Sequence, residues 1–133
     1  MRVKIYKSKN GIIKNIREFD RMQKAGEVVY SFGYEGGFDR VLGKVKWSRK
    51  KTKFCGIFSL YKSAKGSTSK RTDIRYVKAG KGNIEVTIWK DTVRIFLLVK
   101  KSPAAILIKD KDIAKGFKNY WNFMWKHGKK PSR

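Results

Sequence analysis

The sequence predicts a single α/β (α+β) domain in which helices flank a mixed β-sheet. Two long segments carry apolar residues at helical spacing, and short apolar or alternating runs lie between and after them. Helical segments separate the strands of the first half, which favours parallel pairing, whereas the strands of the second half follow one another directly, which favours antiparallel pairing. The length of 133 residues suits one domain with its own core.

The first half of the chain alternates strands with helices. Val3 and Ile5 alternate with polar neighbours, as in a strand, and Ile12, Ile16 and Phe19 recur at helical spacing. Short apolar runs predict two further strands, with a glycine-rich turn and a second helical pattern between them. The expected elements are a strand over 2–6, a helix over 8–24 begun by Ser8 or Asn10 and ended near Gly26, a strand over 27–32, a turn over 33–37, a short helix near 38–45 and a strand over 54–60.

The second half is rich in strands and closes with a helix. Turn-forming and basic residues over 61–71 predict a mobile loop. Lys90-Asp91-Thr92 predicts a hairpin, Asp110 can cap the last helix and Gly128 ends it. The expected elements are strands over 73–77, 84–89, 93–99 and 104–108 and a helix over 110–126, hence a domain over 1–126 and a basic tail over 127–133. The apolar face of that helix is expected to comprise Ile113, Phe117, Tyr120, Trp121, Met124 and Trp125.

The charge balance points to a polyanionic partner. Lys and Arg number 34 against 10 Asp and Glu, so the net charge is +24. Solubility alone needs a magnitude of only about 2–8 in a small domain. A surplus of this size destabilises the compact state by self-repulsion, which binding to nucleic acid relieves because phosphates are neutralised and counterions are released.

A membrane partner is not favoured. No window approaches the ~18 consecutive apolar residues of a membrane-spanning helix, and the sequence has neither a signal-peptide pattern nor a lipidation signal. The single cysteine, Cys55, cannot form an intramolecular disulfide, so a stapled extracellular fold is excluded. We expect a cytoplasmic protein.

The candidate contact surface is a basic stretch without a single acidic residue between Arg40 and Thr72. An aromatic ring among its cations could stack on an unpaired base or close the core. The candidate nucleic-acid-binding residues are Lys44, Lys46, Trp47, Arg49, Lys50, Lys51, Lys53, Lys65, Lys70 and Arg71. A second basic group lies on or near the predicted hairpin, where a strand face could follow a phosphate backbone: Lys90, Arg94, Lys100 and Lys101.

Three segments together resemble a known family. They span 3–12, 26–33 and 84–95, and the last continues through 104–114 to Phe117, Tyr120 and Trp125. Their order resembles the C-terminal domain of TrmB-type archaeal transcriptional regulators, which is similar to one half of the phospholipase D fold. The resemblance implies a phospholipase-D-like half domain of non-enzymatic lineage, here standalone and without the winged-helix domain. It carries over no ligand-binding residue.

The residues do not favour an enzyme. Phospholipase D enzymes use a histidine nucleophile in the pattern His-x-Lys-x4-Asp; the one histidine, His127, starts this pattern, but the Asp position falls beyond Arg133. Capping explains Asp110 and Asp112 better than Mg²⁺ binding does. One His and one Cys cannot form a Cys/His zinc site. We expect no catalysis, no metal and no cofactor.

These observations predict a non-catalytic nucleic-acid-binding protein with a DNA-associated transcription or chromatin role. An RNA-binding, ribosome-associated protein is the first alternative, because a basic loop and a basic tail also suit folded RNA. A module that binds a small ligand or a separate protein is the second alternative. A homodimer is compatible with each of them.

Overall fold

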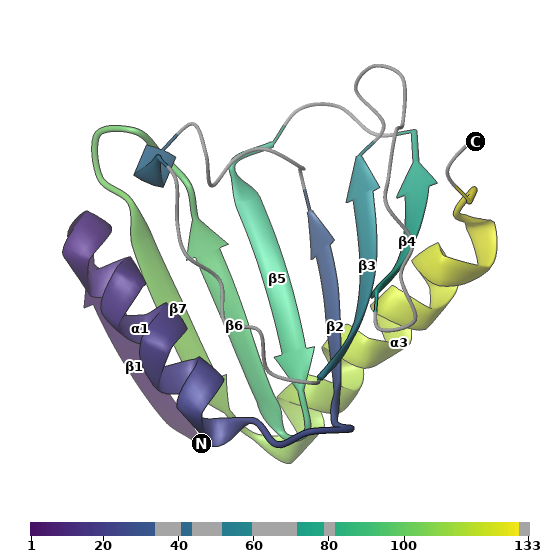
Figure 1. The fold of residues 1–133 in the computed structure, drawn as a ribbon, viewed down its shortest axis with the longest axis horizontal. Helices are drawn as coiled ribbons and strands as arrows, with labels where there is room; N and C mark the ends of the chain where they lie inside the picture. The colour runs from purple at the N-terminus through teal and green to yellow at the C-terminus, as the bar shows by residue number, and fades with distance from the viewer. Residues whose placement is uncertain (34–40, 44–51, 60–71, 79–81, 131–133) are drawn as a thin grey trace.

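The computed structural model describes residues 1–33, 41–43, 52–59, 72–78 and 82–130. Their main feature is a seven-stranded mixed sheet with the order β1-β7-β6-β5-β2-β3-β4 (Figure 1). The elements are β1 (Arg2–Lys7), α1 (Ser8–Met22), β2 (Val28–Gly33), β3 (Lys53–Ser59), β4 (Thr72–Val77), β5 (Ile84–Trp89), β6 (Thr92–Leu97), β7 (Ala104–Lys109) and α3 (Lys111–His127), with a helical turn at Val41 and Leu42.

The strand directions confirm the predicted mixed sheet. β2, β3 and β4 pair in parallel, whereas β2–β5, β5–β6, β6–β7 and β7–β1 are antiparallel. β1 and β2 run in the same direction, as a helical crossover implies, but β7, β6 and β5 lie between them. The chain therefore places its first strand beside its last. The predicted turn over 33–37 and the loop over 61–71 lie largely or wholly outside the described residues.

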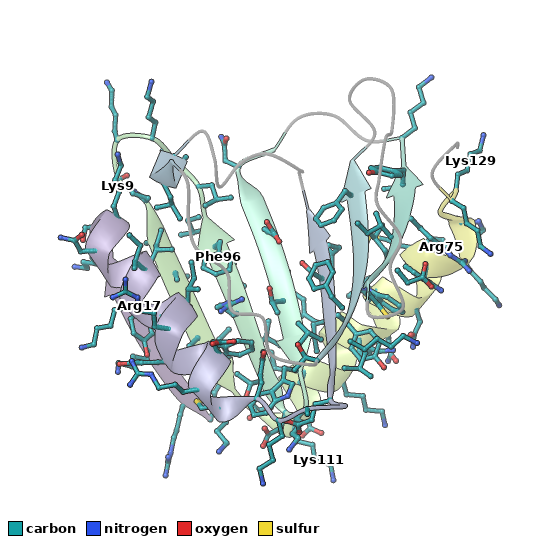
Figure 2. The ribbon with its side chains drawn as sticks, viewed as in Figure 1. Lys9, Arg17, Arg75, Phe96, Lys111 and Lys129 are labelled. Carbon is teal, nitrogen blue, oxygen red and sulfur yellow. The ribbon has the colours of Figure 1, made fainter. Side chains whose placement is uncertain are left out.

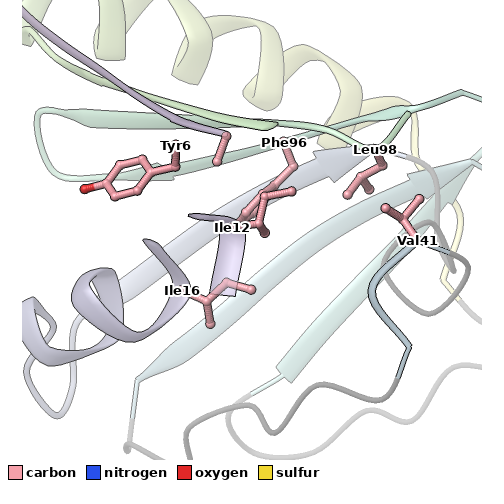
Figure 3. Packing of buried hydrophobic residues seen from close by; sticks show 7 residues of the cluster. Tyr6, Ile12, Ile16, Val41, Phe96 and Leu98 are labelled. Carbon is pink, nitrogen blue, oxygen red and sulfur yellow. The ribbon is translucent and has the colours of Figure 1, made fainter. Parts of the chain in front are cut away.

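Each face of the sheet carries one described helix. α1 contacts β1 and β7, whereas α3 crosses the opposite face over β2 to β7. Alternation along the strands divides the apolar residues between the two faces. Figure 3 shows the α1 side, where Ile12 and Ile16 of the helix meet Phe96, Leu98 and the described turn. The core cluster on that side comprises Tyr6, Ile12, Ile16, Val41, Phe96, Leu98 and Ala105. No helix of the described part has the length and apolarity needed to cross a membrane.

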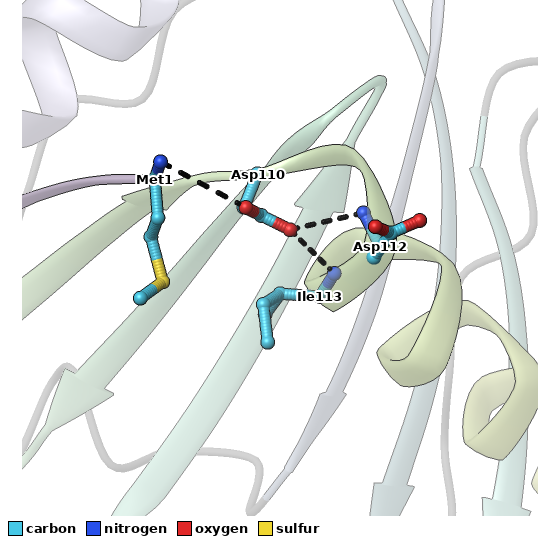
Figure 4. A network of polar contacts seen from close by, with 4 residues as sticks. All are labelled: Met1, Asp110, Asp112 and Ile113. Atoms are coloured by element: carbon cyan, nitrogen blue, oxygen red, sulfur yellow. Dashed lines mark hydrogen bonds and ion pairs between the residues drawn. The ribbon is translucent and has the colours of Figure 1, made fainter.

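The predicted helix starts are correct, and Asp110 acts as expected. Its Oδ1 accepts hydrogen bonds of 3.0 Å from the N–H groups of both Asp112 and Ile113, which are two of the unpaired donors of the first turn (Figure 4). Its Oδ2 lies 4.0 Å from the N-terminal ammonium of Met1. At α1, the hydroxyl of Ser8 accepts a 3.4 Å bond from the Gly11 N–H. Asp110 therefore caps α3 and lies close to the N-terminal ammonium.

The guanidinium of Arg94 is buried between two aromatic rings on the α1 side of β6. It lies 4.1 Å from the ring centroid of Phe19 and 4.3 Å from that of Phe96, and it donates long 3.5 Å bonds to Asn15 and Thr87. Its Nε has no hydrogen-bond partner among the described residues. The prediction that Arg94 lies on a basic strand face is wrong, because that side of β6 faces the core.

Burial also changes the ionisation of Arg94. Desolvation lowers its pKa to about 9, and the carboxylates of Glu85 and Asp20 oppose this effect by favouring the charged form. The side chain is therefore a cation at neutral pH, stabilised by two ring faces and two nearby negative charges. Replacing Arg94 by lysine or by methionine therefore separates the effect of its charge from that of its planar shape.

We expect Gly33→Ala to destabilise the sheet. A Cβ at this position would lie 2.6 Å from the carbonyl oxygen of Ile84 and 2.8 Å from the Cα of Glu85, both backbone atoms of the paired strand β5. Such overpacking costs about 1–3 kcal/mol. Gly116→Ala on α3 is the control, because its Cβ would meet nothing within 4 Å; it should gain up to about 1 kcal/mol from helix propensity. Urea unfolding measures both, and equal free energies for the two variants would contradict the packing argument.

We expect Arg94→Lys to be less stable than Arg94→Met. Lysine keeps the buried charge but loses the planar group between the rings, at a cost of about 2 kcal/mol or more, whereas methionine removes the charge and keeps the volume. The pH dependence has a definite sign. Because the folded pKa lies below the unfolded one, wild type should gain stability relative to Arg94→Met as pH rises above about 9, by about 1 kcal/mol at pH 10. Urea unfolding at pH 8 and pH 10 measures the difference in unfolding free energy between wild type and Arg94→Met. The same difference at both pH values would contradict the desolvation of Arg94.

Candidate nucleic-acid interface

The described part of the chain has one histidine and one cysteine, and no group of three or more His, Cys, Asp or Glu side chains in it could hold a metal ion. His127 is exposed at the end of α3, with its ring 4.7 Å from that of Phe123. Cys55 is buried, and desolvation raises the pKa of its thiol, which disfavours the reactive thiolate.

One group of cations lies in a segment that contains no carboxylate. From Ile113 to Lys130 the chain contains no Asp or Glu. The exposed lysines of this segment, with three exposed ring side chains beside them, form what we call the α3 basic face: Lys115, Tyr120, Phe123, Lys126, His127, Lys129 and Lys130. None of its lysines forms an ion pair within the described part of the chain. Their charges therefore remain available to an external anion.

Three other described lysines are paired with carboxylates. Glu18 lies 3.8 Å from the Lys4 ammonium and 4.0 Å from that of Lys14, and Glu27 pairs with Lys90. A hydrogen bond from Tyr6, followed by the nearby lysines, lowers the pKa of Glu18. α1 does present an exposed row of Lys14, Arg17 and Arg21 at helical spacing, but Glu18 lies within that helix. The exposed row of α1 therefore has carboxylates within its own helix, whereas the α3 basic face lies in a segment without them.

α3 is held firmly against the sheet by aromatic contacts. The Trp121 ring lies 4.7 Å from the Tyr30 ring and stacks on Trp125 at 4.8 Å, and its Nε1 donates a 3.1 Å bond to the carbonyl of Ser31. The guanidinium of Arg75 lies 4.2 Å from the Trp125 ring and donates a 2.7 Å bond to the Trp125 carbonyl. Exposed side chains on this helix therefore project from a rigid support.

Lys118 belongs to this support rather than to the exposed face. Its ammonium lies 4.0 Å from the Tyr30 ring and 4.6 Å from the Trp121 ring, and it donates a 2.6 Å bond to Asn122. Desolvation by burial lowers the pKa of Lys118. The side chain is already engaged in holding α3.

The segment after α3 is anchored to the edge of the sheet. Lys129 and Tyr76 of β4 exchange two backbone hydrogen bonds of 2.7 Å each, which makes an isolated antiparallel bridge. Figure 2 labels Lys129 and Arg75 at this end of the molecule. The bridge sets the position of Lys129 relative to α3.

The exposure of two aromatic rings was not predicted. Tyr120 is 71% exposed and Phe123 is 65% exposed. The prediction that Tyr120 and Ile113 belong to the packed face of the helix is wrong, because α3 rests on Trp121 and Trp125 and turns these residues outward. The sequence contained one usable signal: Phe123 lies outside the apolar face that helical spacing predicts for this segment.

The structure describes one of the ten residues predicted from the basic stretch. Lys53 is exposed at the start of β3, and its backbone N–H donates a 2.8 Å bond to the Glu27 carbonyl. It lies on the same face of the sheet as Cys55, which packs with α3. The others lie outside the described residues: Lys44, Lys46, Trp47, Arg49, Lys50, Lys51, Lys65, Lys70 and Arg71.

Solved structures reveal the fold, whereas sequence comparisons return nothing. No protein-family model and no curated protein sequence matches the chain. TrmBL2, an archaeal chromatin protein whose structure shows a novel mode of DNA binding, matches with a TM-score of 0.65 and 17% identity, over 98% of this chain and 53% of TrmBL2. The chain thus spans about half of the length of that protein. Nuc from Salmonella typhimurium, a phospholipase D family member, matches with a TM-score of 0.59 and 16% identity, over 98% of this chain and 99% of Nuc. The fold is therefore phospholipase-D-like, as the sequence resemblance implied.

Proposed function

We propose that this protein binds nucleic acid without catalysis, contacting the phosphate backbone through a basic surface, in a DNA-associated chromatin or transcription role. The observation that carries the proposal is the α3 basic face, whose exposed lysines have no carboxylate partner within the described residues. Lysine–phosphate contacts position a protein on a polynucleotide without reading its sequence. We therefore expect tight binding with little sequence preference.

The charge of the whole chain supports the same proposal. The net charge of +24 creates a repulsion that phosphates relieve, and the released counterions drive association. The choice of DNA follows from similarity of fold to TrmBL2, which is described as a DNA-binding chromatin protein. RNA is the alternative partner, and direct competition between the two separates them.

The proposal that the protein is not an enzyme rests on the surroundings of His127. It is exposed, its ring lies against Phe123, and the segment from Ile113 to Lys130 offers no carboxylate to orient it as a nucleophile or base. Turnover of a phosphodiester substrate with a divalent metal, lost in His127→Ala, would overturn this part of the proposal.

We expect binding to depend steeply on salt. For about 6–10 phosphate contacts, the affinity should fall roughly 10³-fold or more between about 50 and 200 mM salt. Fluorescence anisotropy with a labelled duplex, competed by structured RNA, measures the slope and the preference. An affinity that does not change over this range would refute phosphate contact as the source of binding.

We expect charge reversal on the α3 basic face to weaken binding more than the same change on α1. Lys126→Glu with Lys130→Glu removes two exposed cations, and the slope of log affinity against log salt should fall by about 0.9 for each lost contact. Arg49→Glu with Lys50→Glu tests the basic stretch predicted from sequence, and we expect a similar loss.

The matched control is Lys14→Glu with Arg17→Glu on α1, which changes the net charge equally but alters a helix that already contains Glu18. If all three pairs reduced the slope alike, binding would follow bulk charge and no defined interface would exist.

A further inference from the structure

We propose that the α3 basic face binds single-stranded polynucleotide, with Tyr120 and Phe123 as stacking surfaces for unpaired bases and the neighbouring lysines as phosphate contacts. This inference rests on the proposed function and narrows its substrate class. It assigns a role to the two exposed rings, which phosphate binding alone does not need.

The two rings are placed as a pair. Tyr120 and Phe123 lie three residues apart on α3, so they are neighbours on the helix surface, about 5 Å apart along its axis. They are 71% and 65% exposed, and each is the kind of flat apolar surface on which a base can stack. An unpaired strand can adapt its spacing to such a pair of rings.

Packing within the monomer does not explain this exposure. The sheet side of α3 is already filled by Trp121 and Trp125, with Phe117 and Met124 beside them. The ring contact found for Phe123 within the described structure is with His127, itself exposed. Two large exposed rings on a lysine-rich helix reduce the solubility of the protein. A ligand that covers these rings removes the exposed apolar surface.

Cations lie within reach of the rings. Lys126 is three residues beyond Phe123 on the same helix, and Lys129 is fixed by its backbone bridge to Tyr76. Lysines beside exposed rings form the combination that binds single strands without sequence preference: a backbone contact next to a stacking surface. Because the aromatic contacts of Trp121 and Arg75 hold the helix in place, binding need not order it.

The geometry distinguishes single strands from duplexes. In a duplex, every internal base is stacked on both faces, so a protein ring can reach only a terminal base. The phosphates of both forms remain open to lysine. The rings should therefore add affinity for a single strand and little for a duplex.

The test compares labelled dT20 and rU20 with their duplexes dT20·dA20 and rU20·rA20, each at several salt concentrations between about 50 and 200 mM. The variant is Tyr120→Leu with Phe123→Leu, which keeps apolar side chains at exposed positions and removes the ring faces. Base stacking contributes about 1–3 kcal/mol per base, so the affinity of this variant for a single strand should fall at least about tenfold. Its affinity for duplex should change by less than about twofold, and its salt slope should match that of wild type because no charge has changed.

The control variant is Val3→Ala with Ile5→Ala, which removes exposed apolar side chains from β1 at the sheet edge. It should bind single strands like wild type. Urea unfolding of each variant confirms that it is folded.

The outcomes separate this inference from the proposed function. Tighter binding of a single strand than of its duplex, lost in the leucine variant, supports the inference. Full single-strand affinity in the leucine variant, or a wild-type preference for duplex, overturns it, and salt-dependent binding would still support the proposed function. In that case sedimentation velocity showing self-association lost in the leucine variant would assign the rings to a second copy of this chain. Absence of salt-dependent binding to all four probes would overturn both.

Discussion

The packing of Trp121 against the sheet is the contact on which the rest of this structure depends. It lies over Tyr30, bonds to the carbonyl of Ser31 and stacks on Trp125. This contact joins α3 to the centre of the sheet, and the cap at Asp110 fixes where the helix starts. Because the side that carries Trp121 must face the sheet, the opposite side of α3 is committed to solvent. The exposed lysines and rings follow from that commitment.

A shortage of carboxylates explains how cations are accommodated inside the molecule. With 34 Lys and Arg and 10 Asp and Glu, ion pairs cannot neutralise most of the positive charge. Aromatic faces take part of this role, because a ring presents negative potential to a cation. Arg94 lies between Phe19 and Phe96, and Arg75 lies on Trp125. Cations that lie on rings stabilise the fold, and the exposed cations of α3 are those that we propose to contact phosphates.

The buried Arg94 shows why a basic residue cannot be assigned to a surface from its type alone. Alternation along β6 was visible in the sequence, but the covering of both faces was not. β6 lies inside the sheet, between β5 and β7, and Arg94 is therefore enclosed beneath α1. The same limit applied to Tyr120, which periodicity placed in a wide apolar stripe, whereas the sheet contacts the part of that stripe that carries Trp121 and Trp125. In both cases the sequence did not show how much of each element its neighbours in the fold would cover.

The sequence by itself determined the kinds of element and their order, the cap at Asp110, the mixed pairing of the strands and the phospholipase-D-like resemblance. The elements and the cap follow from local spacing and capping chemistry, which act over a few residues, whereas the phospholipase-D-like fold was implied by the resemblance of three segments to a known family. The tertiary structure decided that β1 lies beside β7, that Arg94 is enclosed between rings and that Tyr120 and Phe123 are exposed. Those outcomes depend on pairing and packing between residues far apart in the chain, because the burial of a side chain is set by what covers its element rather than by its neighbours in sequence.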